Sequence, residues 1–191
     1  MRKIILASGS PRRSELLTQV GLEHKIIRSN VREDYDEYLL PQEIVMTLAL
    51  RKARDVAKKT TEANALIIAA DTVVVFKGEV LGKPKNAKNS KEMLEKLSDN
   101  RHEVLTGIAL IRLEDGKTIV DYESTTVEFR HITRKEITEY SRKNESRDKA
   151  GGYAIQGAAA KFVSNIEGEY TNVVGLPLCR IAEILNEQFG E

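Results

Sequence analysis

The segment Ala65–Phe76 constrains the fold more than any other part of the chain. It is the most apolar stretch of the sequence and is rich in isoleucine and valine, a pattern typical of a strand buried on both faces. Asp71 interrupts it, and a carboxylate in such a strand is costly unless it is paired, bound to metal or open to a solvent-filled cleft. We therefore predict that Asp71 is catalytic; the alternative is a buried aspartate held by structural hydrogen bonds.

The start of the chain places two arginines where a helix electrostatically prefers carboxylates. Residues 3–7 are expected to form a short strand, Ser10 is a suitable N-cap, and Pro11 suits the first helical position. The helix dipole and the first amide groups make this end positive, and Arg12 and Arg13 add charge of the same sign. An oligophosphate ligand would reverse that balance. The alternative is a pair of solvated arginines on a surface turn.

The rest of the sequence alternates expected helices and strands. Helices are expected at residues 11–20, 41–58, 90–97 with Ser90 as the cap, 133–143 with a capping box, and 178–189. Further strands are expected at residues 25–29, 79–84, 103–113 and 118–130, the last two joined by an Asp-Gly hairpin turn. In the strand 118–130, alternation of apolar and polar residues near its end predicts burial on one face only.

Two lysines stand out against this pattern. Lys52 lies within the apolar stripe of its helix, four residues from Leu48 and four from Val56. Its side chain either extends to water along the helix or brings its ammonium group into a cleft. Lys83 is fixed between a glycine and a proline at the end of a short strand, which alone is weak support for a function. Residues 32–37 form an acidic segment that reads as a solvated loop.

The segment 148–157 is rich in small residues and carries a charge pair, a tyrosine and a glutamine. Glycine allows backbone to approach a ligand closely. The uncharged amide of Gln156 could recognise the edge of a nucleobase through its donor and its acceptor. Plain turn chemistry explains the glycines equally well.

Composition bounds the class of protein. With 191 residues, a formal net charge of +1 and 31% charged residues, we expect a single domain, residues 1–191, without a global field for nucleic acid or membrane. The single cysteine, Cys179, excludes an internal disulfide framework and a cysteine-rich metal site, and it fits a reducing compartment. Residues 4–7 are too short for a signal-peptide core, so we expect a cytoplasmic protein.

Four motifs in order connect the chain to a known family. Residues 8–13 (Ser-Gly-Ser-Pro-Arg-Arg), 70–72 (Ala-Asp-Thr), 82–84 (Gly-Lys-Pro) and 148–157 resemble the motifs of the Maf, or septum-formation-inhibitor, family of nucleoside triphosphate pyrophosphatases. The resemblance covers essentially the whole chain, and Arg12, Thr72 and Gln156 match the dTTP/UTP branch. The branch that prefers methylated guanine nucleotides has a bulky aromatic residue in place of the first arginine.

The resemblance implies an α/β fold, with a long mixed sheet, flanking helices and two lobes around a cleft as in inosine triphosphatases, in a homodimer. It implies house-cleaning hydrolysis of dTTP, UTP and modified pyrimidine nucleotides between the α- and β-phosphates. The implied catalytic residues are Glu33, Lys52, Asp71 and Lys83, and the implied substrate-binding residues are Ser8, Arg12, Arg13, Thr72, Lys149 and Gln156. A divalent cation, Mg²⁺ or Mn²⁺, would be held by Glu33 and Asp71.

The main alternative is a regulator of septum formation that senses nucleotide without essential catalysis. A carboxylate such as Asp71 in an apolar strand argues against pure sensing, because a neutral or basic residue there would bind an anion better. A nucleic-acid partner is disfavoured by the near-zero net charge and the lack of a basic stripe.

Overall fold

A computed structural model describes residues 2–190 of the chain, which cluster into two compact units. Unit 1 contains the described residues up to Asp71, Thr106–Glu123 and those from Gly175 onward. Unit 2 contains Thr72–Leu105 and Ser124–Val174. Three long strands supply residues to both units: β3 (Ala65–Phe76), β5 (Arg101–Arg112) and β6 (Thr118–Phe129).

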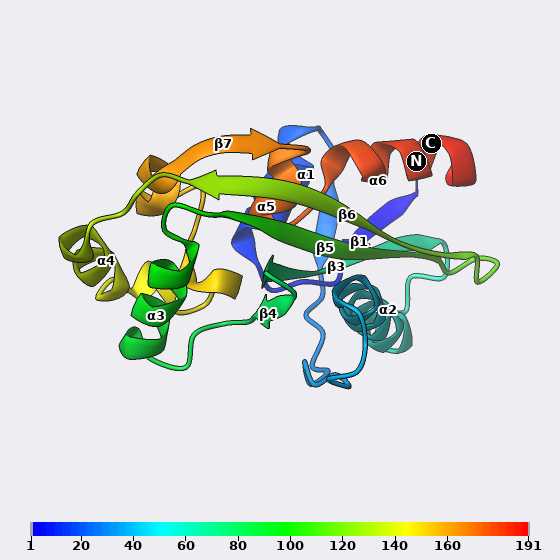
Figure 1. Cartoon of the computed structure of the whole chain (residues 1–191). Coiled ribbons are helices and arrows are strands. Elements are labelled where there is room, and N and C mark those ends of the chain that lie inside the picture. The colour runs from blue at the N-terminus through cyan, green and yellow to red at the C-terminus, as the bar shows by residue number, and fades with distance from the viewer. Residues whose placement is uncertain (1, 191) are drawn as a thin grey trace. The chain divides into compact units, whose positions relative to one another are not determined.

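The strands form one mixed sheet in the order β2-β1-β3-β5-β6-β7, with β4 paired to β3 (Figure 1). The shorter strands are β1 (Lys3–Leu6), β2 (His24–Ile26), β4 (Glu79–Leu81) and β7 (Val163–Glu167). β1 pairs in parallel with β2 and β3, whereas β4 is antiparallel to β3 and β7 is antiparallel to β6. The expected mixed sheet with flanking helices is confirmed.

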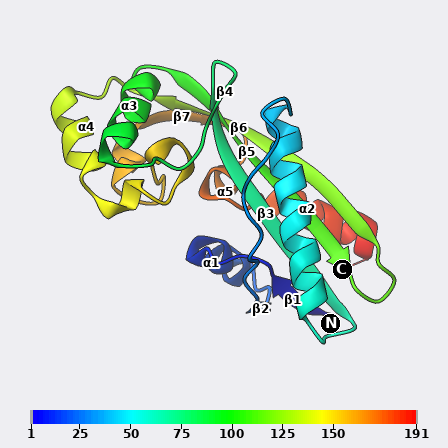
Figure 2. The ribbon, with the colours of Figure 1, turned by 90° about the horizontal axis from the view of Figure 1, so that it is seen from below.

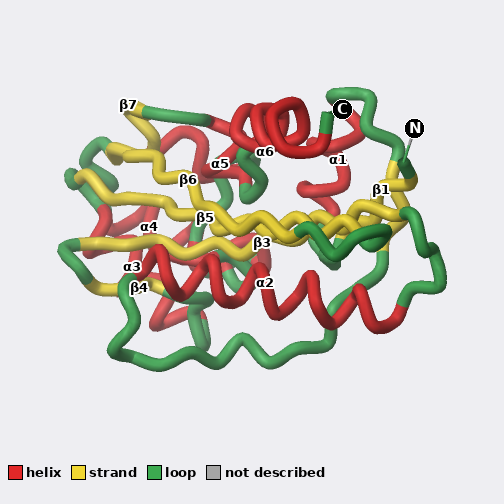
Figure 3. Tube along the Cα trace, turned by 90° about the vertical axis from the view of Figure 1, so that its right-hand side faces the viewer, coloured by secondary structure: helices red, strands yellow, loops and turns green. Residues whose placement is uncertain are grey.

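In unit 1, helices cover both faces of the sheet. α2 (Pro41–Lys59) lies on one face, and α1 (Pro11–Gln19) and α6 (Leu178–Ile184) lie on the other (Figures 1 and 3). The core beneath α2 is formed by small and branched residues of α2, β1 and the residue after it, β3 and β5: Ile5, Ala7, Ala49, Ala53, Val56, Ala65, Ile67, Ala69, Ala109 and Ile111. The two covered faces explain why β3 is apolar at nearly every position.

A glycine lets α2 lie unusually close to the sheet. A Cβ atom on Gly107 of β5 would stand 2.3 Å from the carbonyl carbon of Val45 and 2.5 Å from the amide nitrogen of Met46. Both atoms belong to the backbone of α2, so no side-chain adjustment could make room. The glycine thus sets the distance between the helix and β5.

In unit 2, α3 (Ala87–Leu97) and α4 (Arg134–Ser141) pack against each other (Figure 2). Single 3₁₀ turns at Asn144–Ser146, Ala150–Gly152 and Ala158–Phe162 and the short helix α5 (Tyr170–Val174) complete it. The unit contains an aromatic cluster whose rings meet edge to face, with centroids 4.8–6.2 Å apart: His102, Phe129, Tyr140, Tyr153 and Phe162. Such edge-to-face pairs are the preferred geometry of aromatic side chains.

Most expected elements are confirmed within a residue or two. The helix predicted over 41–58 is α2, and the strand predicted over Ala65–Phe76 is β3. The capping box also forms: Thr133 Oγ1 accepts from the Glu136 amide, and the Glu136 carboxylate accepts from the Thr133 amide. No helix among the described residues is both long and apolar enough to cross a membrane.

Two caps differ from expectation. The side chain of Asn86, not that of Ser90, caps α3, because its Oδ1 accepts from the Asn89 amide at 2.9 Å and the helix begins three residues before Ser90. Ser90 is instead buried inside α3. Ser10 occupies the N-cap of α1, but its side chain makes no capping bond.

The last helix also differs from expectation. It was expected over residues 178–189, but α6 ends at Ile184 and the chain continues as one π-helical turn, Leu185–Phe189.

Candidate active site

Three charged side chains of unit 1 meet at Lys52. Its Nζ donates to Glu33 Oε1 at 2.8 Å and to Asp71 Oδ1 at 2.5 Å. Lys52 is 9% exposed and Asp71 is 7% exposed, so the lysine turns into the protein rather than extending to bulk water. The ion pair offsets the cost of burying the carboxylate in β3. We call Glu33, Lys52 and Asp71 the Lys52 cluster.

The loop that carries Glu33 is held by Arg51, the neighbour of Lys52 on α2. Arg51 Nη1 donates to the Asp34 carbonyl at 2.6 Å, and Nη2 donates to the Arg32 carbonyl at 2.9 Å and to Asp34 Oδ1 at 2.8 Å. The hydrogen bond from Arg51 lowers the pKa of Asp34 below its usual value. The two carbonyls belong to the residues on either side of Glu33. The forked guanidinium group of Arg51, here called the Arg51 fork, therefore fixes the backbone that carries the Glu33 carboxylate. Sequence reasoning missed Arg51, whose only signal was its place beside Lys52.

Arg13 donates hydrogen bonds to three groups of unit 1. Its Nε donates to the Gly175 carbonyl at 2.7 Å, and its Nη1 donates to the Ala70 carbonyl at 2.9 Å and to Ser8 Oγ at 3.2 Å. Burial lowers the pKa of the guanidinium, an effect that the nearby Asp71 opposes. Because Ala70 directly precedes Asp71, Arg13 holds the β3 backbone next to Asp71 and orients Ser8. Arg12, the preceding residue of α1, is half-buried.

Ser8 follows β1 and is buried. Its Oγ also accepts from the Ser10 amide at 3.2 Å, in addition to the Arg13 bond. A serine hydroxyl has one proton and two lone pairs. With both lone pairs engaged, the proton is the group that Ser8 has left to offer a ligand.

The other predicted residues belong to unit 2. Thr72 is half-buried in β3, Lys83 is exposed two residues after the end of β4, and Lys149 forms an ion pair with Asp148. The amide of Gly151 donates to the carbonyl of Gly82 at 3.1 Å, which joins the segment of Lys149 to that of Lys83. The structure therefore brings the two lysine-bearing segments of unit 2 together.

Gln156 stands at the exposed end of an otherwise buried segment. The five residues before it, Gly151–Ile155, are all buried, whereas Gln156 itself is exposed. Gly151 has φ +68° and approaches Val74 so closely that a Cβ would lie 2.8 Å from the valine Cγ2. The glycines of this segment thus serve close packing, and the glutamine amide faces solvent.

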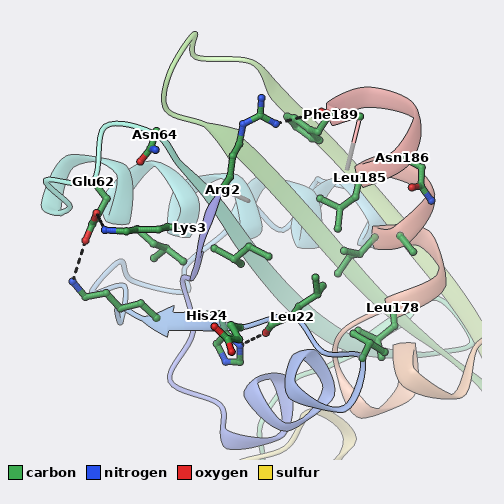
Figure 4. A pocket seen from close by; sticks show the side chains of 18 residues that line it. Arg2, Lys3, Leu22, His24, Glu62, Asn64, Leu178, Leu185, Asn186 and Phe189 are labelled. Carbon is green, nitrogen blue, oxygen red and sulfur yellow. Dashed lines mark hydrogen bonds and ion pairs between the residues drawn. The ribbon is translucent and has the colours of Figure 1, made fainter.

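A hollow of about 1160 Å³ in unit 1 is separate from these groups (Figure 4). Figure 4 shows Lys3 at its rim, bonded to Glu62 at 2.8 Å, and Leu178 and Leu185 on its apolar side. None of the predicted catalytic or substrate-binding residues is among the described residues that line it. The chemistry predicted from the sequence therefore does not use this hollow.

The donor set of the Lys52 cluster suits a divalent cation only in part. Two carboxylates that contact one ammonium group already surround a positive charge, and carboxylate oxygens suit Mg²⁺ and Mn²⁺. Among the described residues, no group of three or more histidine, cysteine, aspartate or glutamate side chains could hold a metal ion. Mg²⁺ commonly uses one or two carboxylates together with substrate phosphates, so two carboxylates fit a cation that arrives with a phosphate ligand.

The fold places the chain among mixed α/β proteins, and its candidate site has a buried lysine between two carboxylates. A family model identifies the family. The model described as Maf-like protein matches residues 3–188, and the chain belongs to the Maf family. A relative from Bacillus cereus (strain B4264), named dTTP/UTP pyrophosphatase, is 47% identical over 98% of this chain and 96% of its own length. One of the same name from Alkaliphilus metalliredigens (strain QYMF) is 46% identical over 99% of this chain and 97% of its own.

Among solved structures, that of the Staphylococcus aureus Ham1 protein matches with a TM-score of 0.45 and 22% identity. The match covers 67% of this chain and 72% of that chain.

Proposed function

We propose that this chain is a nucleoside triphosphate pyrophosphatase that hydrolyses dTTP and UTP to the monophosphate and pyrophosphate. The observation that carries the proposal is the buried ion pair of Lys52 with Asp71, together with the second bond from Lys52 to the exposed carboxylate of Glu33. Relatives named dTTP/UTP pyrophosphatase, 46–47% identical over nearly the whole chain, support the substrate class. One family model over residues 3–188 supports a single catalytic domain, residues 1–191.

Basic and hydroxyl groups bind the triphosphate in this proposal. Arg12 at the start of α1, Lys83 and Lys149 supply positive charge, and Ser8 donates its remaining proton to a phosphate oxygen. Arg13 is proposed to act through Ser8, because it donates to that hydroxyl and is held by the Ala70 and Gly175 carbonyls. This assignment refines the sequence prediction, in which both arginines bound phosphate directly.

Asp71 accepts a proton from the attacking water in the proposed reaction, and Glu33 shares this role where Asp71 binds the metal, because a metal-bound carboxylate is a poorer base. The water oxygen forms a bond to the α-phosphorus, the bond from that phosphorus to the bridging oxygen breaks, and pyrophosphate leaves with the bonding electrons. Lys52 and Lys83 offset the negative charge that develops on the leaving group. Lys52 also neutralises Glu33 and Asp71, which would otherwise repel a polyanion.

We propose that Glu33 and Asp71 hold a Mg²⁺ or Mn²⁺ ion that enters with the nucleotide. When bound, such an ion polarises phosphoryl oxygens and neutralises their charge. With such an ion in place, Lys52 would give up part of its contact with the two carboxylates. The expected result is activity that disappears with excess chelator and returns with either cation; full activity in chelator would remove this role from Glu33.

Gln156 is proposed to recognise the base. Its amide can pair with both the O4 acceptor and the N3–H donor of uracil or thymine, and it is the exposed residue of a buried segment. Thr72 is proposed to contact the nucleoside as well. Uracil and thymine differ by one methyl group, which discriminates weakly, whereas a mismatched polar edge discriminates strongly.

The deciding experiment is a screen of nucleoside triphosphates with separate detection of pyrophosphate and orthophosphate. We expect dTTP and UTP to give the monophosphate with pyrophosphate, and CTP and the purine nucleotides to react slowly. Release of orthophosphate alone would place cleavage at the γ-phosphate. Binding without hydrolysis of any nucleotide would favour a sensing role instead.

The assembly and compartment are further proposals. The family resemblance favours a homodimer, which sedimentation equilibrium of the purified protein would test. The single cysteine, Cys179, is exposed, which fits a reducing cytoplasm. Fractionation of cells that express the protein would test the compartment.

A further inference from the structure

His102 is a buried histidine whose presence simple packing does not explain. It is 3% exposed, and its ring meets Phe129 and Tyr153 edge to face at centroid distances of 4.9 and 5.4 Å. Its Nε2 lies 2.8 Å from the Tyr153 hydroxyl, while its Nδ1 has no hydrogen-bond partner among the described residues. A phenylalanine would fill this place without an unpaired buried nitrogen. The bond to Tyr153 is therefore the property that distinguishes histidine here.

That bond belongs to a series of contacts along the segment that ends in Gln156. Tyr153 bonds to His102, and the next amide, that of Ala154, donates to the Tyr140 hydroxyl at 3.0 Å. The Ala154 carbonyl in turn accepts from the Gly157 amide at 3.0 Å. Two consecutive residues are thus fixed to the aromatic cluster, and the turn that follows encloses Gln156.

The far side of Gln156 is held as well. The Ala158 amide donates to Glu145 Oε1 at 3.0 Å. A Cβ atom on Gly157 would lie 1.4 Å from the same carboxylate oxygen, so the glycine is needed for this approach. Gln156 is therefore an exposed side chain between two fixed backbone points.

We infer that His102 and Tyr140 are positioning residues that determine the base specificity of the site by fixing Gln156 through Tyr153 and Ala154. The inference rests on the proposed function, in which Gln156 recognises the base. An amide distinguishes uracil from cytosine only if its donor and acceptor are held at the right place, and displacements near 1 Å are costly for reaction geometry. Burial lowers the pKa of His102 to about 4, so the ring is neutral near pH 7 and offers one acceptor and one N–H.

The test compares His102→Phe, Tyr153→Phe and the double variant. Steady-state kinetics with UTP and CTP are measured well below each melting temperature. Each single variant is expected to lower the ratio of kcat/KM for UTP over CTP by about tenfold, mostly through KM for UTP, with kcat changed less than about threefold. The double variant pairs two apolar rings and should recover most of the lost stability, yet its selectivity should stay as low as that of the singles.

Two comparisons separate positioning from general destabilisation. Val127→Ala truncates a buried β6 residue of the same unit and should lower stability without changing the UTP/CTP ratio. Hydrogen exchange, which needs no activity, should show faster exchange of the Ala154 and Gly157 amides in the His102 and Tyr153 variants. Tyr140→Phe should accelerate exchange at Ala154 and lower the ratio by a similar factor.

The inference is overturned if the folded single variants keep wild-type selectivity, or if the double variant recovers selectivity together with stability. One outcome would refute the positioning role of His102 but leave the proposed function standing. In that outcome the wild-type protein prefers UTP, Gln156→Ala loses the preference, and His102→Phe keeps it. If the wild-type protein shows no pyrimidine preference, or no pyrophosphate release, the proposed function itself has failed.

Discussion

The Lys52 cluster of unit 1 and the aromatic cluster of unit 2 bury polar groups in opposite ways. In the first, the buried groups are charged, and Lys52 donates to the carboxylates of Glu33 and Asp71. In the second, the polar atoms are neutral, and His102 leaves one nitrogen without a partner among the described residues. A buried charge is costly unless an opposite charge or several hydrogen bonds compensate it, whereas a neutral ring tolerates a missing partner at a smaller cost.

The difference corresponds to two kinds of work. In unit 1 the groups proposed to react, Asp71 and Lys52, are themselves the buried ones. In unit 2 the group proposed to meet the substrate, Gln156, is exposed, and the buried residues support it. Changes in unit 1 should therefore act on turnover, and changes in the aromatic cluster should act on stability and selectivity.

The largest effect is expected from Asp71→Asn. It removes the proposed base and one partner of Lys52 but keeps the shape of the side chain, so kcat should fall by about 10²–10⁴-fold while nucleotide binding persists. Stopped assays for turnover and calorimetric titration with UTP would measure the two quantities. Asp115→Asn in the β5–β6 turn is the matched control and should turn over like the wild type. Near-wild-type kcat in Asp71→Asn would sink the assignment.

The next effect concerns stability and pH. Because burial lowers the pKa of His102 from 6.5 to about 4, the unfolded chain binds its proton more readily between these values. The free energy of unfolding should thus fall as pH drops from 6.5 to 4, by on the order of 3 kcal/mol from this residue. The small hollow that His102 lines is also lined by the charged residues Lys77, Arg101 and Glu103. These three residues are the same in the wild type and in a His102→Phe variant, so their titration does not distinguish the two proteins.

Urea unfolding at several pH values, compared between wild type and His102→Phe, isolates this contribution. The variant lacks the titrating ring, so the difference in unfolding free energy between the two proteins should shrink or change sign on acidification. Parallel pH curves for the two proteins would show that the ring does not carry the effect. Shifted carboxylates, such as Glu136 with a pKa of about 2, contribute equally to both curves.

A smaller effect is expected from Arg51→Met. Loss of the fork should loosen the backbone around Glu33 and raise the Mg²⁺ concentration for half-maximal activity by about fivefold, with turnover at saturating metal reduced less. Binding of Mn²⁺, followed by electron paramagnetic resonance with a non-hydrolysable nucleotide, provides a second readout. Arg54→Met, an exposed arginine of the same helix, is the control. Equal behaviour of the two variants would contradict a role for Arg51.

The smallest effect is expected from Ser90→Ala. Ser90 Oγ is fully buried in α3 and has no hydrogen-bond partner among the described residues. Its removal should leave stability unchanged or raise it by up to about 1 kcal/mol, since no bond is lost and a buried hydroxyl is removed. Thermal and urea unfolding would measure this. A loss of more than about 1 kcal/mol would mean that the hydroxyl is satisfied in solution.

The sequence predicted the parts of the molecule whose signal is local. The apolar run of β3 with Asp71 inside it, and Lys52 in an apolar stripe, were visible because a charge in a buried pattern needs a partner. Arg51 was not, because its three bonds go to a loop whose path the sequence does not give. β7 and α5 were also missed, since they are short and depend on tertiary contacts.

The same limit applies to individual side chains. Ser90 was expected to cap α3 because serine is a good cap, but Asn86, four residues earlier, is as good a cap and the helix began there. His102 carried no signal at all, because a lone histidine in a strand has no periodicity that marks its bond to a tyrosine 51 residues away. Contacts across such distances follow from the fold and not from neighbouring residues.

The close approach at Gly107 fixes the position of α2 at Val45, so any tilt of the helix would pivot about this contact. Val45, which touches that glycine, precedes Lys52 by seven residues, about 10 Å along the helix axis. A rotation of about six degrees about the pivot would carry the Lys52 end through about 1 Å, as much as the reaction geometry tolerates. Gly107 of β5 is distant in sequence from the Lys52 cluster. Its lack of a side chain nevertheless fixes the position of the Lys52 ammonium group.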